Sequence, residues 1–129
     1  HDPAQVNDLY SRTVTPHLFE GLYGYDHLAR PWKIEAVTAA GMPEVSADFR
    51  VWTVRIQPGI LFQDDPAFKG ARRELTAADY VYSFKRFADP RLKSPNWTSL
   101  DAQAGLVGLR ALREEAIRTG KPFDYDKPI

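Results

Sequence analysis

The most regular pattern of apolar and polar positions in the chain lies between residues 76 and 88. Apolar side chains recur there at helical spacing and form one stripe: Tyr80, Val81, Phe84 and Phe87. Thr76 is suited to the N-cap. The carboxylate of Asp79, in the first turn, interacts favourably with the free backbone N–H groups and the positive end of the helix dipole. Because Pro90 cannot continue a helix, the pattern predicts a well-capped amphipathic helix over residues 76–88.

Two further segments show helical features. A second apolar stripe predicts a helix that runs to about residue 119 and that Gly120 and Pro122 terminate: Leu106, Leu109, Leu112, Ala116 and Ile117. Residues 91–100, between these helices, are expected to form a loop. Near the start of the chain, Thr15 and Pro16 are suited to the N-cap and first position of a short helix that ends at Gly21 or Gly24.

Residues 49–57 alternate between apolar and polar in the manner of a strand buried on one face. Pro58-Gly59 predicts a turn, residues 60–62 a second short strand, and residues 25–48 irregular structure. Short strands mixed with longer helices favour the α+β class, as a small mixed sheet with flanking helices. The expected core combines strand and helix: Trp52, Val54, Tyr80, Phe84 and Phe87.

Four blocks of sequence resemble one family when taken together. Residues 76–90 (TAADYVYSFKRFADP) are similar to the signature helix of family 5 extracellular solute-binding proteins, the periplasmic receptors of oligopeptide, dipeptide and nickel ABC importers. Residues 18–23 resemble the family's "lFEgL" element, residues 43–62 its "evS.Dg.twTf.lRpGv.F" block, and residues 89–95 its "DPr..SP" block. The blocks occur in family order and cover roughly residues 15–129.

Two details refine this resemblance. The insertion at residues 64–70 (DDPAFKG) is similar to the longer peptide-receptor branch of the family. Phe49 stands where the family usually has glycine after Asp48, so the turn there is expected to be shaped differently.

The resemblance implies a fold and a function. Family members resemble a two-lobed clamp that closes over its ligand, with a third subdomain attached to the first lobe. By position, residues 1–24 are expected to begin the first lobe and residues 25–129 to form the attached α+β subdomain, the chain being an excised piece that stops before the second lobe. The implied function is the capture of peptides in the periplasm, with an ABC permease as partner, and the isolated piece is expected to be mainly structural.

Asn96 and Trp97 are the residues expected to touch the ligand. They follow Pro95 on the predicted loop between two helices, where binding residues tend to lie. An aromatic face and an amide suit peptide recognition, and the resemblance places this loop near the ligand cleft. The alternative, which the residues alone favour, is that Trp97 packs into the core beneath the loop.

Composition and charge narrow the possible functions. The 17 basic and 17 acidic side chains cancel, and no run of five like charges occurs, which argues against nucleic acid or an anionic membrane as a partner. No apolar run is long enough to cross a membrane. Because the chain has no cysteine, it has neither disulfides nor thiolate metal ligands. His1-Asp2-Pro3 shows no signal segment, so an exported protein is expected to have been processed or cut there.

Candidate reactive groups are few. His17 and Glu20 are spaced to share a metal, but a metal site needs more ligands, and a structural role is preferred. The pairs Asp64-Asp65 and Asp124/Asp126 are better explained as turn-forming, helix-capping or solvated residues than as an acid–base or calcium site.

No nucleophile elbow or phosphate loop is present, so we expect neither enzymatic activity nor a cofactor. The alternative function is a protein-interaction module that docks on a partner such as the permease.

Overall fold

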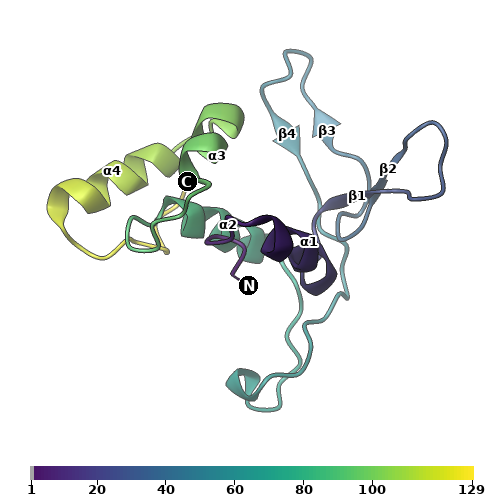
Figure 1. Ribbon diagram of the computed structural model, residues 1–129, viewed down its shortest axis with the longest axis horizontal. Helices are drawn as coiled ribbons and strands as arrows, with labels where there is room; N and C mark the ends of the chain where they lie inside the picture. The colour runs from purple at the N-terminus through teal and green to yellow at the C-terminus, as the bar shows by residue number, and fades with distance from the viewer. Residues whose placement is uncertain (1) are drawn as a thin grey trace. The chain divides into compact units, whose positions relative to one another are not determined.

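The structure, a computed structural model, describes residues 2–129 and contains both helices and short strands (Figure 1). The helices are α1 (Leu9–Leu18), η1 (Pro66–Phe68, a 3₁₀ turn), α2 (Ala77–Ala88), α3 (Trp97–Ala104) and α4 (Leu109–Thr119). The strands are β1 (Tyr23–Tyr25), β2 (Ile34–Ala36), β3 (Glu44–Val45) and β4 (Trp52–Thr53). This mixture confirms the predicted α+β class.

The chain divides into two compact units. Unit 1 comprises Leu18 and the residues before it together with Ala78–Ile129, and unit 2 comprises Phe19–Ala77. Unit 1 therefore contains α1, α3, α4 and nearly all of α2, whereas unit 2 contains every strand of the described residues.

The core of unit 1 forms where α4 packs near the end of α2. Five side chains are buried together: Ala88, Leu109, Leu112, Ala116 and Phe123. Four partly buried side chains pack against them: Trp97, Leu100, Leu106 and Tyr125. The apolar stripe predicted for the second helix thus supplies most of this core, except that Ile117 points into solvent and is 59% exposed.

The predicted helix over residues 76–88 is confirmed within one residue, but the next helical pattern is broken into two helices. Gly105 takes the left-handed conformation at φ 55 and ends α3 with a bond from its N–H to the Asp101 carbonyl. Gly108 is also left-handed, at φ 84, and α4 begins after it. The prediction of a loop over residues 91–100 was wrong from Trp97 onward, because α3 begins there.

The first helix begins earlier than predicted. α1 starts at Leu9, and Pro16 lies inside it rather than at its first position. The cause is Asp8, whose carboxylate accepts a hydrogen bond from the Ser11 backbone N–H at 2.8 Å and so caps the free N-terminal donors. This bond lowers the pKa of the Asp8 carboxyl.

Unit 2 contains two antiparallel pairs of strands instead of the single mixed sheet that was expected. β1 pairs with β2, with Tyr23 opposite Ala36, and β3 pairs with β4, with Val45 opposite Trp52. Strands joined directly along the chain pair in the antiparallel sense, which accounts for both sheets. Residues 25–48, expected to be irregular, supply β2 and β3.

The strand predicted over residues 49–57 is reduced to β4 and an isolated bridge between Ile56 and Ala39. It cannot begin at residue 49, because Phe49 takes the left-handed conformation at φ 58. The turn therefore has glycine-type geometry even though it carries a phenylalanine. The predicted strand 60–62 is likewise a single bridge, between Leu61 and Glu74.

The core assignment that included Trp52 was wrong, since this side chain is 59% exposed. Val54, Tyr80, Phe84 and Phe87 are only half-buried. In unit 2 the buried residues are Thr38 and Ala39. Two-stranded sheets present one or both faces to solvent, so alternation along the sequence did not guarantee burial.

We predict that Leu109→Ala lowers the free energy of unfolding by about 2–5 kcal/mol, because it removes a buried side chain from a packed core. Ile117→Ala, on the exposed face of the same helix, is the control and should change it by less than about 0.5 kcal/mol. Urea unfolding followed by circular dichroism measures both. Equal effects of the two substitutions would contradict the core described above.

We predict that Phe49→Gly slows exchange of the Ser46 amide, which bonds to the Val51 carbonyl across the turn, by about 5- to 30-fold. Glycine removes the cost of roughly 1–2 kcal/mol that a left-handed conformation imposes on other residues. Phe49→Val should accelerate the same exchange, because a β-branched residue is least tolerated at positive φ. Hydrogen exchange of the Ser46 amide is measured by NMR. Slower exchange in Phe49→Val than in the unsubstituted chain would contradict backbone strain at this position.

Candidate functional site

The two residues predicted to touch ligand lie together at the start of α3. Asn96 is the N-cap residue, and Trp97 is the first residue of the helix. The Asn96 side chain makes no capping bond. Instead, its Nδ2 donates to the Val6 carbonyl at 2.9 Å, and its Oδ1 accepts from Arg12 Nη2 at 3.2 Å. The amide therefore ties the N-terminal segment and α1 to α3.

Trp97 is half-buried and packs against the core of unit 1. The guanidinium carbon of Arg113 lies 5.1 Å from the centre of the indole ring, and Arg113 Nη1 donates to the Ala88 carbonyl at 2.9 Å. A cation over the ring face holds the indole in place and reduces its accessible area. This packing agrees with the core interpretation of Trp97 and leaves ligand contact as a prediction.

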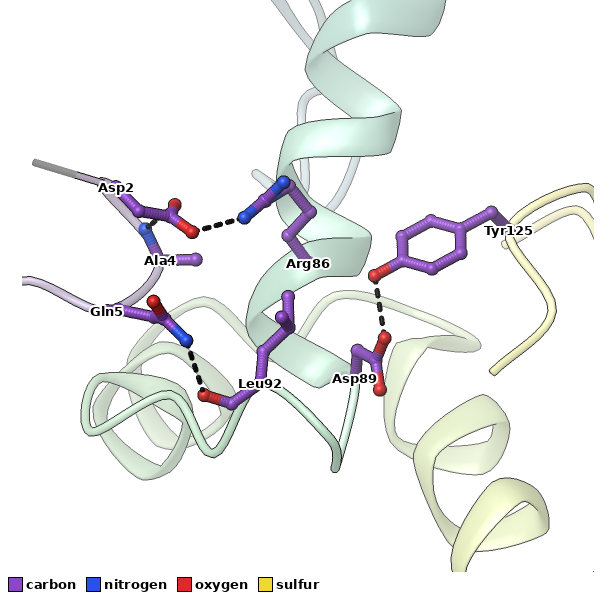
Figure 2. A network of polar contacts seen from close by, with 7 residues as sticks. All are labelled: Asp2, Ala4, Gln5, Arg86, Asp89, Leu92 and Tyr125. Carbon is purple, nitrogen blue, oxygen red and sulfur yellow. Dashed lines mark hydrogen bonds and ion pairs between the residues drawn. The ribbon is translucent and has the colours of Figure 1, made fainter. Parts of the chain in front are cut away.

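A polar network next to this site surrounds the C-terminal half of α2 (Figure 2). On one side, Arg86 forms an ion pair with Asp2, and Gln5 Nε2 donates to the Leu92 carbonyl at 3.2 Å. On the other side, the Tyr125 hydroxyl donates to Asp89 Oδ2 at 2.8 Å. The network fastens two segments without regular structure, residues 2–6 and residues 121–129, to Arg86 of α2 and to Asp89 and Leu92, which follow that helix.

Electrostatics distinguish Tyr125 from the other members of this network. Burial, and secondarily the hydrogen bond to Asp89 and the nearby carboxylate charge, raise the pKa of Tyr125 well above its ordinary value of 10.0. A phenol of this kind stays protonated at neutral pH and serves as a hydrogen-bond donor. The arrangement is structural and contains no nucleophile held beside a base.

The other candidate groups have structural partners or stand apart. No group of three or more His, Cys, Asp or Glu residues in the described chain is placed to hold a metal, so His17 and Glu20 gain no further ligand. Asp65 caps η1 by accepting from the Ala67 N–H at 2.8 Å, and Asp124 accepts from the N–H groups of Asp126 and Lys127.

Asp64 and Asp65 also line an open hollow of about 430 Å³ with Pro66, Gly70 and Arg72. No helix within residues 2–129 is long and apolar enough to span a membrane.

Three important side chains of this region escaped sequence analysis: Arg12, Lys85 and Arg113. Each is a basic residue that reaches a distant partner, as Arg12 does across 84 positions to Asn96. Lys85 and Arg113 carried a weak signal, because a charged residue within an apolar stripe is placed close to the core. Their individual partners follow only from the tertiary structure.

Comparison with known proteins gives a consistent result. The family described as "Bacterial extracellular solute-binding proteins, family 5 Middle" matches residues 14–123. The chain is 31% identical over 96 residues to the periplasmic oligopeptide-binding protein OppA of Salmonella typhimurium, an alignment covering 73% of this chain and 15% of the relative.

Two further relatives agree. It is 31% identical over 111 residues to the periplasmic murein peptide-binding protein MppA of Escherichia coli (86% of this chain, 18% of the relative). It is 36% identical over 70 residues to the glutathione-binding protein GsiB of Pectobacterium atrosepticum (54% and 13%). The chain thus spans less than a fifth of the length of these relatives. No solved structure matches it significantly.

We predict that the free energy of unfolding falls as pH rises above about 10, and that Tyr125→Phe reduces this decline. The folded-state pKa is raised, so the contribution of Tyr125 is complete below the unfolded-state pKa and is lost as pH rises toward the folded-state pKa. Tyr10→Phe, at an 83% exposed tyrosine, is the matched control and should keep the decline. Urea titrations at pH 8 to 11 test the difference, and identical pH profiles for Tyr125→Phe and the parent sequence would disprove it.

Proposed function

The chain belongs to family 5 of the bacterial extracellular solute-binding proteins, and we propose that it is part of a receptor that captures peptides in the periplasm for an ABC importer. The observation that carries this proposal is the family match over residues 14–123. This is a family of binding proteins, not of enzymes. The names of two relatives specify peptides as ligands, oligopeptides in one and murein peptides in the other.

Within that receptor, residues 1–24 would begin the first lobe and residues 25–129 would form an attached subdomain of a two-lobed clamp. A clamp gains affinity by enclosing its ligand and removing water from it. A subdomain without the opposing lobe leaves a peptide half in water, so its role is mainly structural. The parent receptor would supply the opposing lobe and the surface that meets the permease.

Asn96 and Trp97 remain our proposed ligand contacts in the parent receptor. The support is their position at one helix start, with the indole held by Arg113 and the amide held by Arg12 and Val6. A ring that is fixed before binding loses little entropy when a ligand packs on it. The opposing consideration is that both polar atoms of the Asn96 amide already have partners, so a ligand would have to share or replace them.

A second candidate function is a protein-interaction module that docks on a partner such as the permease. It is favoured by large apolar side chains of unit 2 that face solvent, including Trp32, Phe49 and Trp52, which are 72%, 74% and 59% exposed. Large apolar side chains exposed to solvent occur at protein–protein binding sites.

We predict that the isolated chain binds peptides weakly whereas the full-length parent binds them tightly. The isolated chain would form only part of the contacts with the peptide. The free-energy cost of association, about 4–15 kcal/mol, would remain in full. Isothermal titration calorimetry with a mixed oligopeptide pool and then single peptides compares the two. Micromolar or tighter binding by the chain alone would overturn the structural role, and no peptide binding by the parent would overturn peptide capture.

In the parent, Trp97→Ala should weaken peptide binding by about 1–3 kcal/mol if the ring packs on ligand. Trp52→Ala, at an exposed tryptophan of unit 2, is the matched control and should leave affinity unchanged. Unchanged affinity in the Trp97 variant together with a lower melting temperature would assign Trp97 to the core alone.

A further inference from the structure

Residues 121–129 cross unit 1 without forming a helix or strand. They begin after Gly120, which caps the C-terminal end of α4, and return to the opposite end of that helix. At that end, a Cβ atom built on Gly108 would lie 3.2 Å from the Cα atom of Ile129 (the yellow end of the chain in Figure 1). This segment, called the strap below, therefore runs from one end of α4 back to the other, with bends at residues 125–127.

Nothing in the backbone of the strap explains why it stays there. Within residues 2–129, no backbone–backbone hydrogen bond involves residues 121–129. The turn at Asp124 is local, since its carboxylate accepts from Asp126 and Lys127 within the strap itself. Phe123 is buried in the core and fixes the beginning of the strap, so residues 124–129 must be held by side chains.

Lys85 of α2 provides the strongest such contact. It is only 4% exposed, which is rare for lysine, and its Nζ donates to the carbonyl oxygens of both Tyr125 and Lys127 at 2.7 Å. Hydrogen bonds from a charged donor are stronger than neutral ones, and burial shields them from water. One ammonium group thus holds two positions of the strap.

The remaining contacts are weaker or hold a single position. Lys127 and Glu115 form an ion pair at 2.6 Å, but both side chains are nearly half exposed, and such pairs contribute little. Tyr125 reaches Asp89 through one hydrogen bond and packs against Phe123 and Tyr82, with ring centres 5.1 and 5.0 Å away.

We infer that Lys85 is a positioning residue that locks the strap on α2, and that removal of its charge releases residues 124–129 while the helices remain folded. This conformational device is independent of the proposed ligand. It makes residues 124–129 a local unit whose attachment depends mainly on one buried cation, beyond the point at which Phe123 joins the core.

The test is trimming of the chain by carboxypeptidase Y, followed by intact mass spectrometry. The enzyme needs a free, extended C-terminal segment, so the rate at which Lys127 and then Tyr125 are removed reports release of the strap. In Lys85→Met, which keeps an apolar stem of similar length, we expect this rate to rise at least ~10-fold, with the far-UV circular dichroism of the helices unchanged.

Two further variants make the result specific. Glu115→Gln breaks only the surface ion pair and should change the trimming rate less than ~3-fold. Lys85→Arg retains a cation with several donors and should trim more slowly than Lys85→Met. The inference is overturned if the unsubstituted chain is trimmed past Tyr125 as fast as a denatured chain, if Lys85→Met trims no faster than Glu115→Gln, or if Lys85→Met loses the helices together with the strap.

Discussion

The close approach of α4 to the end of α2 is the interaction on which the rest of unit 1 depends. Ala88, the last residue of α2, is fully buried and belongs to the same core cluster as Leu109 and Leu112. The contact brings Arg113 within reach of the last carbonyl of α2, where a cation is favoured by the helix dipole, and the same guanidinium then covers Trp97. A larger residue at position 88 would separate the helices and release each of these contacts.

Local signals in the sequence predicted local structure well. Thr76, Asp79 and Pro90 marked α2 within one residue, and the leucine stripe of α4 identified three of its buried positions. The strands were predicted poorly, because a two-residue strand such as Trp52–Thr53 has too few positions for alternation to show whether a side chain becomes buried. The split between α3 and α4 depended on two left-handed glycines, and glycine alone does not reveal its φ angle.

At the candidate site, too, local sequence signals and tertiary contacts differ in how well they could be predicted. Asn96 and Trp97 were expected on a loop between two helices, whereas they lie at the start of α3, and their side-chain partners Arg12 and Arg113 come from α1 and α4. The spacing of residues did not indicate a function, but the family resemblance indicated a class of binding proteins. The match over residues 14–123 confirmed that class. The structure shows that this amide and this indole already make contacts within the fold. A ligand would have to share or replace these contacts.

The contact between Gly108 and Ile129 has a consequence for how freely this sequence can vary. Gly59, Gly70 and Gly120 also have positive φ, yet a Cβ atom at any of them would meet nothing within 4 Å, so asparagine is an acceptable exchange there. Gly108 is restricted twice, by its φ of 84 and by the backbone of Ile129 beside it. Across a saturation library, position 108 should thus behave as the least substitutable of these four sites, and a compensating change elsewhere would have to move the main chain itself.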